Sequence, residues 1–408
     1  MRIAVVTQYF SPEPARIVGT LAQGLAARGH SVRVVTGFPN YPEGRLYDGY
    51  RLRWRQDEQI GGVAVRRVPL FPSHSLSAAG RVVNYLSFGL AALSARSFVR
   101  DADVVYVYAT QMTASIAPDL WRRWGGPPFV LHVLDLWPES ATSSSMIRAG
   151  RVVRLVERVL ARWLKGVYRR SSGVIAIAPT MAHMLVKRGA PTEVTDTVLN
   201  WAADEAATGE DRTVRDADHV TVMYAGNLGD LQGLNVAVEA ARRVAQDTPR
   251  FRLVLVGTGV AEQRLRRAAE QLPNVEFRPR VPIDQMPQLY AESDFQLVIL
   301  RDLEIFRGTI PSKFQGSLAA GVPVVTSVPG DVASMVREHR LGFAAQAGDV
   351  DSLAHAFRAA AGTTWAEWQE MSRRASHTYV ATMSMDRGLD RIEQILHRAA
   401  DASVGVRA

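Results

Sequence analysis

Residues 220–233 read VTVMYAGNLGDLQG, and LNVAVEAARRVAQ follows to residue 246. The apolar, β-branched start predicts a buried strand over Val220–Tyr224, and the later apolar spacing predicts a helix over Asn235–Gln246. Glycines lie between the two, where the chain turns from strand to helix. Because this strand, loop and helix form one βα unit, repetition of the pattern predicts a parallel sheet with crossover helices.

The same alternation continues on both sides of this unit. In the second half we expect strands at Phe251–Val256, Val275–Phe277, Phe295–Leu300 and Val322–Thr326, and helices at Ala261–Gln271, Met286–Glu292 and Phe314–Ala320. In the first half we expect strands at Arg2–Thr7, Ser31–Thr36, Val63–Pro69, Val104–Tyr108 and Phe129–Leu134, and helices at Val18–Arg28 and Gly80–Arg100.

A polar run without apolar periodicity, TGEDRTVRDAD at residues 208–218, separates the two halves and predicts a domain boundary. We therefore predict an α/β chain of two doubly wound domains, over residues 1–210 and 217–383. A C-terminal helix is expected over 384–408, with apolar residues at helical spacing.

Composition excludes several classes of protein. The chain has 408 residues with 47% hydrophobic residues and no cysteine, so disulfide scaffolds, cysteine-ligated metals and thiol nucleophiles are excluded. The formal net charge is +8, and lysine occurs only at positions 165, 187 and 313. This charge favours partners that carry phosphate, but dispersed arginines without interleaved aromatic residues argue against nucleic acid.

The sequence also predicts a cytoplasmic location. The N-terminus starts a strand directly and shows no secretory signal, and the longest uncharged apolar stretch, Val82–Ala95, falls short of the roughly 20 residues that span a bilayer. We therefore expect no membrane-spanning helix.

Three loops of the second half follow predicted strands, where doubly wound domains bind ligands. Gly226 and Gly229 let backbone approach an anion, although ordinary strand-to-helix turns use the same residues. The loop with Thr258 is read more simply as a tight turn. Pro311, Ser312 and Lys313 start a helix, where the dipole and the lysine favour phosphate. The GxGxxG dinucleotide motif is absent.

In the first half, the loop LHVLDLWPES brings His132, Asp135 and Glu139 to the end of a strand, an arrangement suited to acid–base work. A buried histidine beside Trp137 as a core residue is the structural alternative. The sequence lacks the HExxH, Walker A and GxSxG motifs, so no motif supports a zinc protease, a P-loop NTPase or a serine hydrolase.

Together these segments resemble the retaining glycosyltransferases of family 4. The resemblance runs nearly end to end and rests on TQYFSPEP, LHVLDLWPES, MYAGNLGDLQGL, LVLVGTGVAEQRL and TIPSKFQGSLAAGVPVV. Within the family, the chain is most similar to transferases of bacterial O-antigen, capsule and colanic acid. The resemblance implies the GT-B architecture of two facing Rossmann-like domains, with a C-terminal helix that crosses back to the first.

The resemblance also implies roles for individual residues. The second domain would bind a nucleotide-diphosphate sugar, with uridine preferred and guanosine as an alternative base, and the first would bind the acceptor, a lipid-linked saccharide or a small molecule. No metal or other cofactor is implied. The expected residues are His132 and Asp135 for catalysis; Gly226, Asn227, Gly229, Lys313, Ser312 and Arg307 for the diphosphate; Arg280, Val281, Thr258 and Gly316 for the base and ribose; and Glu13, Arg16 and Glu139 on the acceptor side.

Some positions depart from the family pattern. Gly308 and Gly316 stand where the family has two glutamates, so the contacts to the donor sugar and the ribose are lost or come from elsewhere, for instance from Glu304. Gln232 replaces a frequent lysine of the glycine loop. These departures keep two alternatives open: a GT-B nucleotide-sugar 2-epimerase, which turns over its donor without an acceptor, and a non-catalytic nucleotide-sugar-binding partner.

A basic helix is predicted between residues 148 and 170. Its arginines recur every three or four residues, with apolar residues on other faces, which suits contact with anionic lipid at the inner face of the cell membrane. A solvated face of a packed helix is the alternative.

Overall fold

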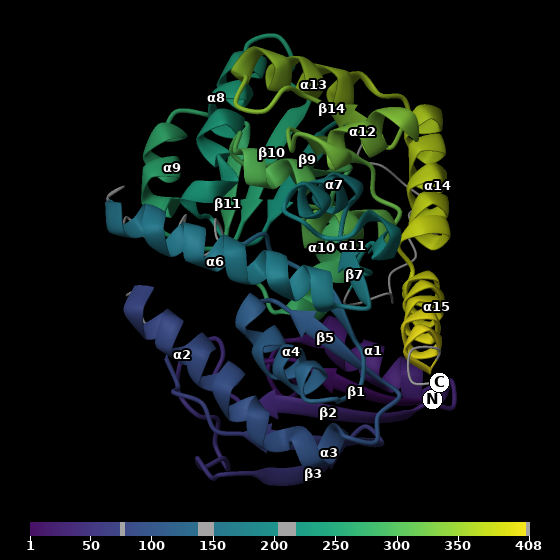
Figure 1. Cartoon of the computed structure of the whole chain (residues 1–408). Helices are drawn as coiled ribbons and strands as arrows, with labels where there is room; N and C mark the ends of the chain where they lie inside the picture. Colours follow the sequence, from purple (N-terminus) through teal and green to yellow (C-terminus); the bar gives the residue numbers. More distant parts are fainter. Residues whose placement is uncertain (74–77, 138–150, 203–217, 405–408) are drawn as a thin grey trace. The chain divides into compact units, whose positions relative to one another are not determined.

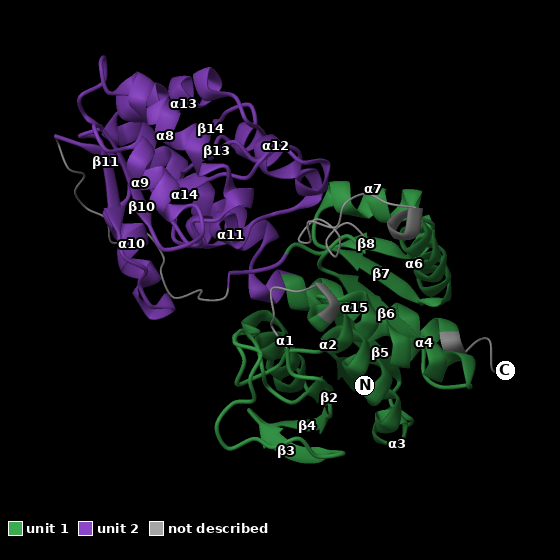
Figure 2. Cartoon of the chain, turned by 90° about the vertical axis from the view of Figure 1, so that its left-hand side faces the viewer, with its two compact units in different colours: residues 1–199, 388–408 green, residues 200–387 purple. Residues whose placement is uncertain are grey.

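The structure, a computed structural model, describes residues 1–73, 78–137, 151–202 and 218–404 (Figure 1). The chain divides into two compact units (Figure 2): unit 1 is Met1–Leu199 with Gly388–Ala408, and unit 2 is Asn200–Arg387. The polar run at 208–218, where the sequence suggests a boundary, lies outside the described residues except for Asp218. The expected pair of doubly wound α/β units is confirmed.

Unit 1 is built on an eight-stranded sheet in the order β3-β4-β2-β1-β5-β6-β7-β8. All neighbouring pairs are parallel except β3 with β4. The parallel strands are almost wholly buried, as helices on both faces require. Their bounds are β1 Arg2–Val6, β2 Ser31–Gly37, β3 Gln56–Ile60, β4 Val63–Val68, β5 Val104–Ala109, β6 Phe129–Val133, β7 Gly173–Ala176 and β8 Thr195–Thr197.

The sequence pattern did not indicate β3. Its residues, QDEQI, are polar and alternately exposed, because β3 is an edge strand that hydrogen-bonds to one neighbour only. The helices of unit 1 are α1 Arg16–Ala27, α2 Ala78–Ala91, α3 Arg96–Val99, α4 Ile116–Arg123, α6 Arg151–Arg170 and α7 Pro179–Lys187, with the 3₁₀ turns η1 Ala92–Ala95, η2 Met112–Ser115 and η3 Thr192–Val194.

The helical run Gly80–Val99 is long and apolar enough, by length and composition alone, to cross a membrane, and 33% of it is buried within the protein. This run includes Arg81 and Arg96, so it is longer than the charge-free stretch Val82–Ala95 from which we expected no membrane-spanning helix, and that expectation stays a prediction. A packed helix of a soluble protein meets the same test. Here Asn84 is buried and accepts a hydrogen bond of 2.6 Å from Gln8, so α2 is held to the loop that follows β1.

Unit 2 has a six-stranded sheet in the order β11-β10-β9-β12-β13-β14, and every neighbouring pair is parallel. Alternate residues of β9 belong to different core clusters: Val222 and Tyr224 to one, Met223 and Ala225 to the other. The sheet is therefore buried on both faces. The strands are β9 Val220–Ala225, β10 Phe251–Val256, β11 Val275–Arg278, β12 Phe295–Val298, β13 Val324–Thr326 and β14 Gly342–Ala344.

The helices of unit 2 follow the strands as crossover connections. They are α8 Leu234–Val244, α9 Glu262–Ala268, α10 Met286–Glu292, α11 Ser312–Ala319, α12 Asp331–Glu338, α13 Val350–Gly362 and α14 Trp365–Thr382, with η5 Asp230–Gln232, η6 Ile283–Gln285 and η7 Glu304–Gly308 as 3₁₀ turns. A Thr364–Glu367 capping box starts α14.

The C-terminal helix, α15 Met385–Val404, returns to unit 1 as expected. Its apolar face is buried, with Ile392 and Leu396 0% exposed. Leu389 packs against Gly24 of α1, where a Cβ would lie 2.5 Å from a methyl group of Leu389. Arg28 pairs with Asp390 at 2.6 Å, so charged contacts flank the apolar seam.

Candidate functional site

The loop that follows β9, Gly226–Gly229, is held by the loop that follows β10. The Gly226 N–H donates to the Val256 carbonyl at 2.8 Å, and the Leu228 N–H donates to the Thr258 carbonyl at 2.9 Å. The amides of Gly226 and Leu228 are therefore used within unit 2, while the expected contacts of Asn227 and Gly229 with a diphosphate stay predictions. Thr258 itself is exposed, and Asn227 is exposed above Leu228.

Lys313 lies directly against this glycine loop. A Cβ on Gly226 would stand 2.6 Å from Lys313 Nζ, and the Gly226 φ of +148° also requires glycine. The ammonium lies 4.8 Å from the centroid of the Tyr224 ring, and the Tyr224 hydroxyl donates to the Asn227 carbonyl at 2.8 Å. Lys313, the end of β9 and the glycine loop thus pack together.

Burial lowers the pKa of the Lys313 ammonium because surrounding protein atoms exclude water from the charge. A bound anion would favour the charged form of the lysine, since a cation in a partly dry site attracts an anion more strongly than in water. Lys313 follows Ser312, the exposed first residue of α11, with Pro311 at the N-cap. The cation and the helix N-terminus therefore lie at the same place.

The other predicted donor residues occupy separate loops at the carboxyl edge of the same sheet. Arg280 is exposed after β11, whereas Val281 packs against a cluster that includes Leu289 of α10. Arg307 is exposed in η7, and its carbonyl oxygen lies 2.1 Å from where a Cβ on Gly330 would stand. Glu304, the substitute considered for a missing glutamate, is exposed in the same turn.

The two glycines that replace the family glutamates have different surroundings. Gly308 is buried in η7. At Gly316 a Cβ would lie 2.3 Å from the Tyr290 hydroxyl, so Tyr290 of α10 fills the space in which a glutamate side chain would start. Gln232 contributes a buried Oε1 atom that has no hydrogen-bond partner among the described residues.

His132 lies in β6 in unit 1 and is 1% exposed. Its Nδ1 hydrogen-bonds with the Tyr106 hydroxyl at 2.5 Å, while Nε2 is buried without a partner in the described part of the chain. Burial lowers the pKa of His132 to about 3, so the ring is neutral near pH 7. The neutral ring presents Nε2 as a single hydrogen-bonding atom.

Tyr108 interacts with both His132 and Asp135. The Tyr108 ring meets the His132 ring edge-on at 5.6 Å, and the Asp135 charge raises the pKa of Tyr108 further after burial has raised it. Asp135 reaches the surface, but protein atoms around it exclude water and raise the pKa of its carboxyl. Such a carboxyl is suited to hold or accept a proton.

Four tyrosines and a tryptophan surround this region, and we call them the tyrosine cluster: Tyr9, Tyr41, Tyr85, Tyr108 and Trp137. Tyr9 and Tyr41 lie 4.9 Å apart between ring centroids, and Tyr85 meets Trp137 edge-on at 6.2 Å. Sequence reasoning considered only Trp137. The signal for Tyr9 and Tyr108 was their place at the carboxyl ends of β1 and β5, the edge that binds ligands in such sheets.

Glu13 holds two loops of the tyrosine cluster together. It is 4% exposed, and its carboxylate accepts hydrogen bonds from the N–H groups of Phe10, Asn40 and Tyr41 at 3.1, 2.8 and 2.9 Å. Its oxygens are thus used by the loops that carry Tyr9 and Tyr41, so we assign Glu13 a positioning role. Arg16 is the exposed first residue of α1, and Glu139 lies outside the described residues.

Comparison with known proteins places this geometry among enzymes. Residues 14–201 match the family model described as glycosyl transferase 4-like domain, and residues 219–362 match that of glycosyl transferases group 1. The chain is similar to the colanic acid biosynthesis glycosyl transferase WcaI of Escherichia coli K12, at 27% identity over 79% of this chain and 82% of that protein.

A second relative and a solved structure are also similar to the chain. The chain is 23% identical to the colanic acid biosynthesis glycosyltransferase WcaL of Salmonella typhimurium, over 74% of this chain and 75% of that protein. The crystal structure of HepE of Anabaena with UDP and glucose has a TM-score of 0.66 at 17% identity and covers 97% of this chain and 99% of its own. The arrangement of two Rossmann-like units with a returning helix is therefore the GT-B fold.

Proposed function

The chain belongs to the group 1 glycosyl transferases, and on that basis we propose that it transfers a hexose or N-acetylhexosamine from a UDP-linked sugar to a hydroxyl of a bacterial surface-glycan intermediate. The observation that carries this proposal is the Lys313 ammonium against the glycine loop of unit 2. The colanic acid roles of WcaI and WcaL support the glycan class, and the UDP and glucose bound to HepE support the donor class.

Sugar transfer from such a donor leaves negative charge on the diphosphate. A cation and a helix N-terminus that are already in place stabilise that charge in the transition state without reorganisation. Lys313 and the first turn of α11 would act in this way, with Ser312 as a hydroxyl donor and Arg307 as a second cation. This arrangement supports transfer without a catalytic metal, because the fixed cation supplies the charge a metal would supply.

We propose retention of anomeric configuration, with the acceptor hydroxyl attacking on the face from which the diphosphate leaves. Asp135, whose pKa is raised by burial, would accept a proton from the acceptor or hold it by a hydrogen bond. The neutral His132 would contribute a hydrogen bond through Nε2 and would not act as a charged acid. The tyrosine cluster suits a sugar acceptor, since aromatic rings pack against pyranose C–H faces and their hydroxyls form hydrogen bonds.

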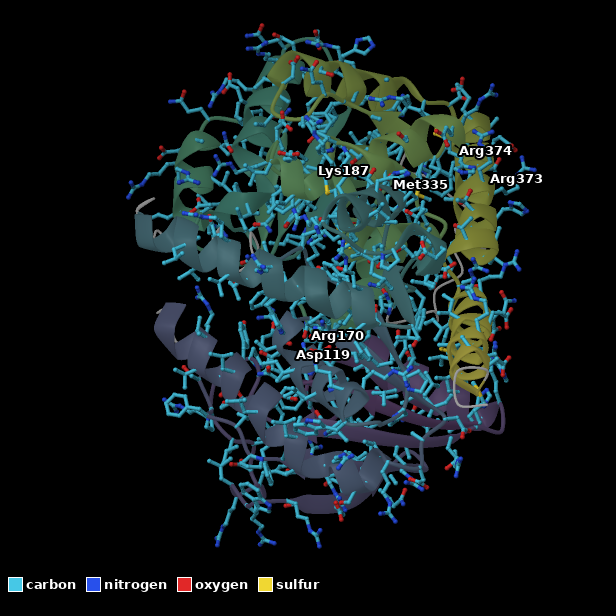
Figure 3. All side chains as sticks on the ribbon, viewed as in Figure 1. Asp119, Arg170, Lys187, Met335, Arg373 and Arg374 are labelled. Atoms are coloured by element: carbon cyan, nitrogen blue, oxygen red, sulfur yellow. The ribbon has the colours of Figure 1, made fainter. Side chains whose placement is uncertain are left out.

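Binding of UDP and uridine tests the role of Lys313. We expect Lys313→Ala to weaken UDP about 10- to 100-fold, because a charge-assisted contact is worth about 1.5–3 kcal/mol, while uridine affinity stays the same. Isothermal titration calorimetry measures both ligands. Lys187→Ala, a change at an exposed lysine of unit 1 (Figure 3), is the matched control. An equal loss for UDP and uridine would exclude a diphosphate contact.

Turnover of the UDP-linked donor, measured with and without an acceptor, distinguishes a transferase from a 2-epimerase and from a non-catalytic binding partner. A transferase releases UDP from its donor only when an acceptor is present, whereas a 2-epimerase converts the donor alone. A binding partner retains UDP affinity and turns over no donor. Tyr290 in place of a side chain at position 316 is the feature that keeps the third outcome open, because it alters the place where the family glutamate would stand.

We also propose that the enzyme acts at the inner face of the cell membrane on a lipid-linked acceptor. The outer face of α6 carries Leu155, Val156 and Val159 at 56%, 50% and 61% exposure. The same helix exposes four basic residues, Arg158, Arg162, Lys165 and Arg169, and no exposed acidic residue between 155 and 170. Apolar and basic residues together fit anionic lipid. Arg148 of the predicted basic helix lies outside the described residues.

Helix α2 has an exposed apolar side of its own. It supplies Tyr85 to the tyrosine cluster, and it exposes four large apolar residues on its outer side: Val82, Val83, Leu86 and Leu90. A bilayer that covers this side would bring a lipid-linked saccharide to the tyrosine cluster along the helix. Exposed apolar residues that gather on one helix often mark such a contact.

Vesicle sedimentation tests the membrane proposal. We expect binding to vesicles that contain phosphatidylglycerol and little binding to phosphatidylcholine alone, and we expect Arg158→Glu with Arg162→Glu to abolish it. Each basic residue contributes about 1 kcal/mol near an anionic surface, so reversal of two charges should lower vesicle affinity at least about tenfold. Arg373→Glu with Arg374→Glu, on α14 of unit 2 (Figure 3), is the matched control. Equal losses in both pairs would point to overall charge alone.

A further inference from the structure

Two histidines and a glutamate gather in unit 1, beside the start of β2. His30 precedes β2, and Glu393 and His397 lie on α15. One ligand atom from each residue lies within 4.8 Å of the other two. Glu393 and His397 are four residues apart, so both side chains leave the same face of the helix. The glycosyl transfer proposed above uses none of the three.

Local structure holds His30 in place. The N–H of Gly29 donates to the Ala26 carbonyl at 3.0 Å, and the N–H of His30 donates to the Leu25 carbonyl at 3.2 Å. These two hydrogen bonds are those of a Schellman motif at the C-terminus of α1. Gly29 has the positive φ, +87°, that this end requires. His30 Nδ1 lies 3.1 Å from the Met1 nitrogen, so the ring turns Nε2 toward Glu393.

Glu393 is held from two sides. Its Oε1 lies 2.8 Å from His30 Nε2, and Arg28 donates to its Oε2 at 3.1 Å. Arg28 orients the second oxygen, as outer partners commonly do around metal ligands.

We propose that His30, Glu393 and His397 bind a divalent cation of the zinc class. Two imidazole nitrogens and one carboxylate oxygen form a borderline ligand set that suits zinc and cobalt better than magnesium or calcium. The side chain of His30 is only 7% exposed, whereas His397 is at the surface, so an ion could reach the cluster from that side. A bound ion would link α15 to the residue before β2 and would stabilise unit 1.

Zinc titration of the full chain, freed of metal with EDTA, tests this site. We expect one equivalent of ZnCl₂ to bind and to raise the melting temperature, because an ion that binds only the folded state stabilises it. His397→Ala removes an exposed ligand and should weaken zinc at least about 100-fold, since even outer partners contribute roughly 10- to 100-fold. His183→Ala, at an exposed histidine of α7, should change nothing.

Cobalt supplies a readout on the unaltered chain. Co²⁺ in a nitrogen and oxygen site shows visible d–d bands, which zinc should displace with the same stoichiometry. A wild-type chain that binds neither ion would overturn the proposal, and so would equal zinc affinity in wild type and His397→Ala. Either result is independent of glycosyl transfer and leaves the proposed function untouched.

Discussion

At the scale of single residues, burial decides which groups can titrate. His132 has a folded pKa of about 3, whereas an unfolded histidine titrates near 6.5. Between these values the unfolded chain binds a proton that the folded chain does not. The contribution of His132 to stability is therefore complete above about pH 6.5 and is lost as pH falls toward 3.

We expect His132→Gln to remove this acid sensitivity. From about pH 7.5 to about pH 5.5, the wild-type chain should lose about 1.4 kcal/mol of unfolding free energy more than the variant. Urea unfolding at several pH values measures the difference, and comparison with the variant cancels all other titrating groups. Parallel curves for the two proteins would mean that His132 takes up its proton in the folded chain over the same pH range as in the unfolded chain.

At the scale of elements, the two loops after β9 and β10 depend on close backbone approach. A Cβ on Gly257 would lie 1.9 Å from the Gly226 carbonyl oxygen, and Gly257 has a φ of +140°. Gly257→Ala should therefore displace the glycine loop from Lys313, cost at least about 1–3 kcal/mol and weaken UDP binding. Gly362→Ala, at the end of α13 with nothing within 4 Å, is the control.

Calorimetry with UDP and denaturant unfolding measure both effects of the glycine substitutions. Gly362→Ala should leave UDP binding as it is and change stability little. If Gly257→Ala binds UDP like the wild type, then the packing of this loop pair does not control the donor half of the site.

At the scale of the whole molecule, α15 completes unit 1 although unit 2 precedes it in the chain. Ile392 and Leu396 are fully buried in unit 1, while Gln394 on the same helix is exposed. Ile392→Ala should lower the stability of unit 1 by about 2–5 kcal/mol through loss of burial and a residual cavity. UDP affinity, which we propose to depend on unit 2, should stay unchanged.

Hydrogen exchange read by mass spectrometry can test this division. Ile392→Ala should speed exchange in α1, β1 and β2, which belong to unit 1, and leave β9 to β14 protected as in the wild type. Gln394→Ala should change neither. Faster exchange throughout both sheets would mean that the two units unfold as one cooperative body.

The local pattern of the sequence determined most strands, most crossover helices and the loops in which to look for a site. This works because apolar period, glycine and proline act over a few residues. Lys313 at the start of α11 was predictable from Pro311 and Ser312 on the same grounds. The pattern also indicated an apolar face on the C-terminal helix, whereas its return to the first domain was implied by the family resemblance.

Tertiary structure alone decided which residues meet. His30 and Glu393 are 363 positions apart, Glu13 joins the loops of Tyr9 and Tyr41, and Tyr290 fills the space at Gly316. The edge strand β3 is likewise stabilised by its pairing with β4, because its own residues bury little. Strand order and packing create such contacts between distant segments, and no local period in the sequence records them.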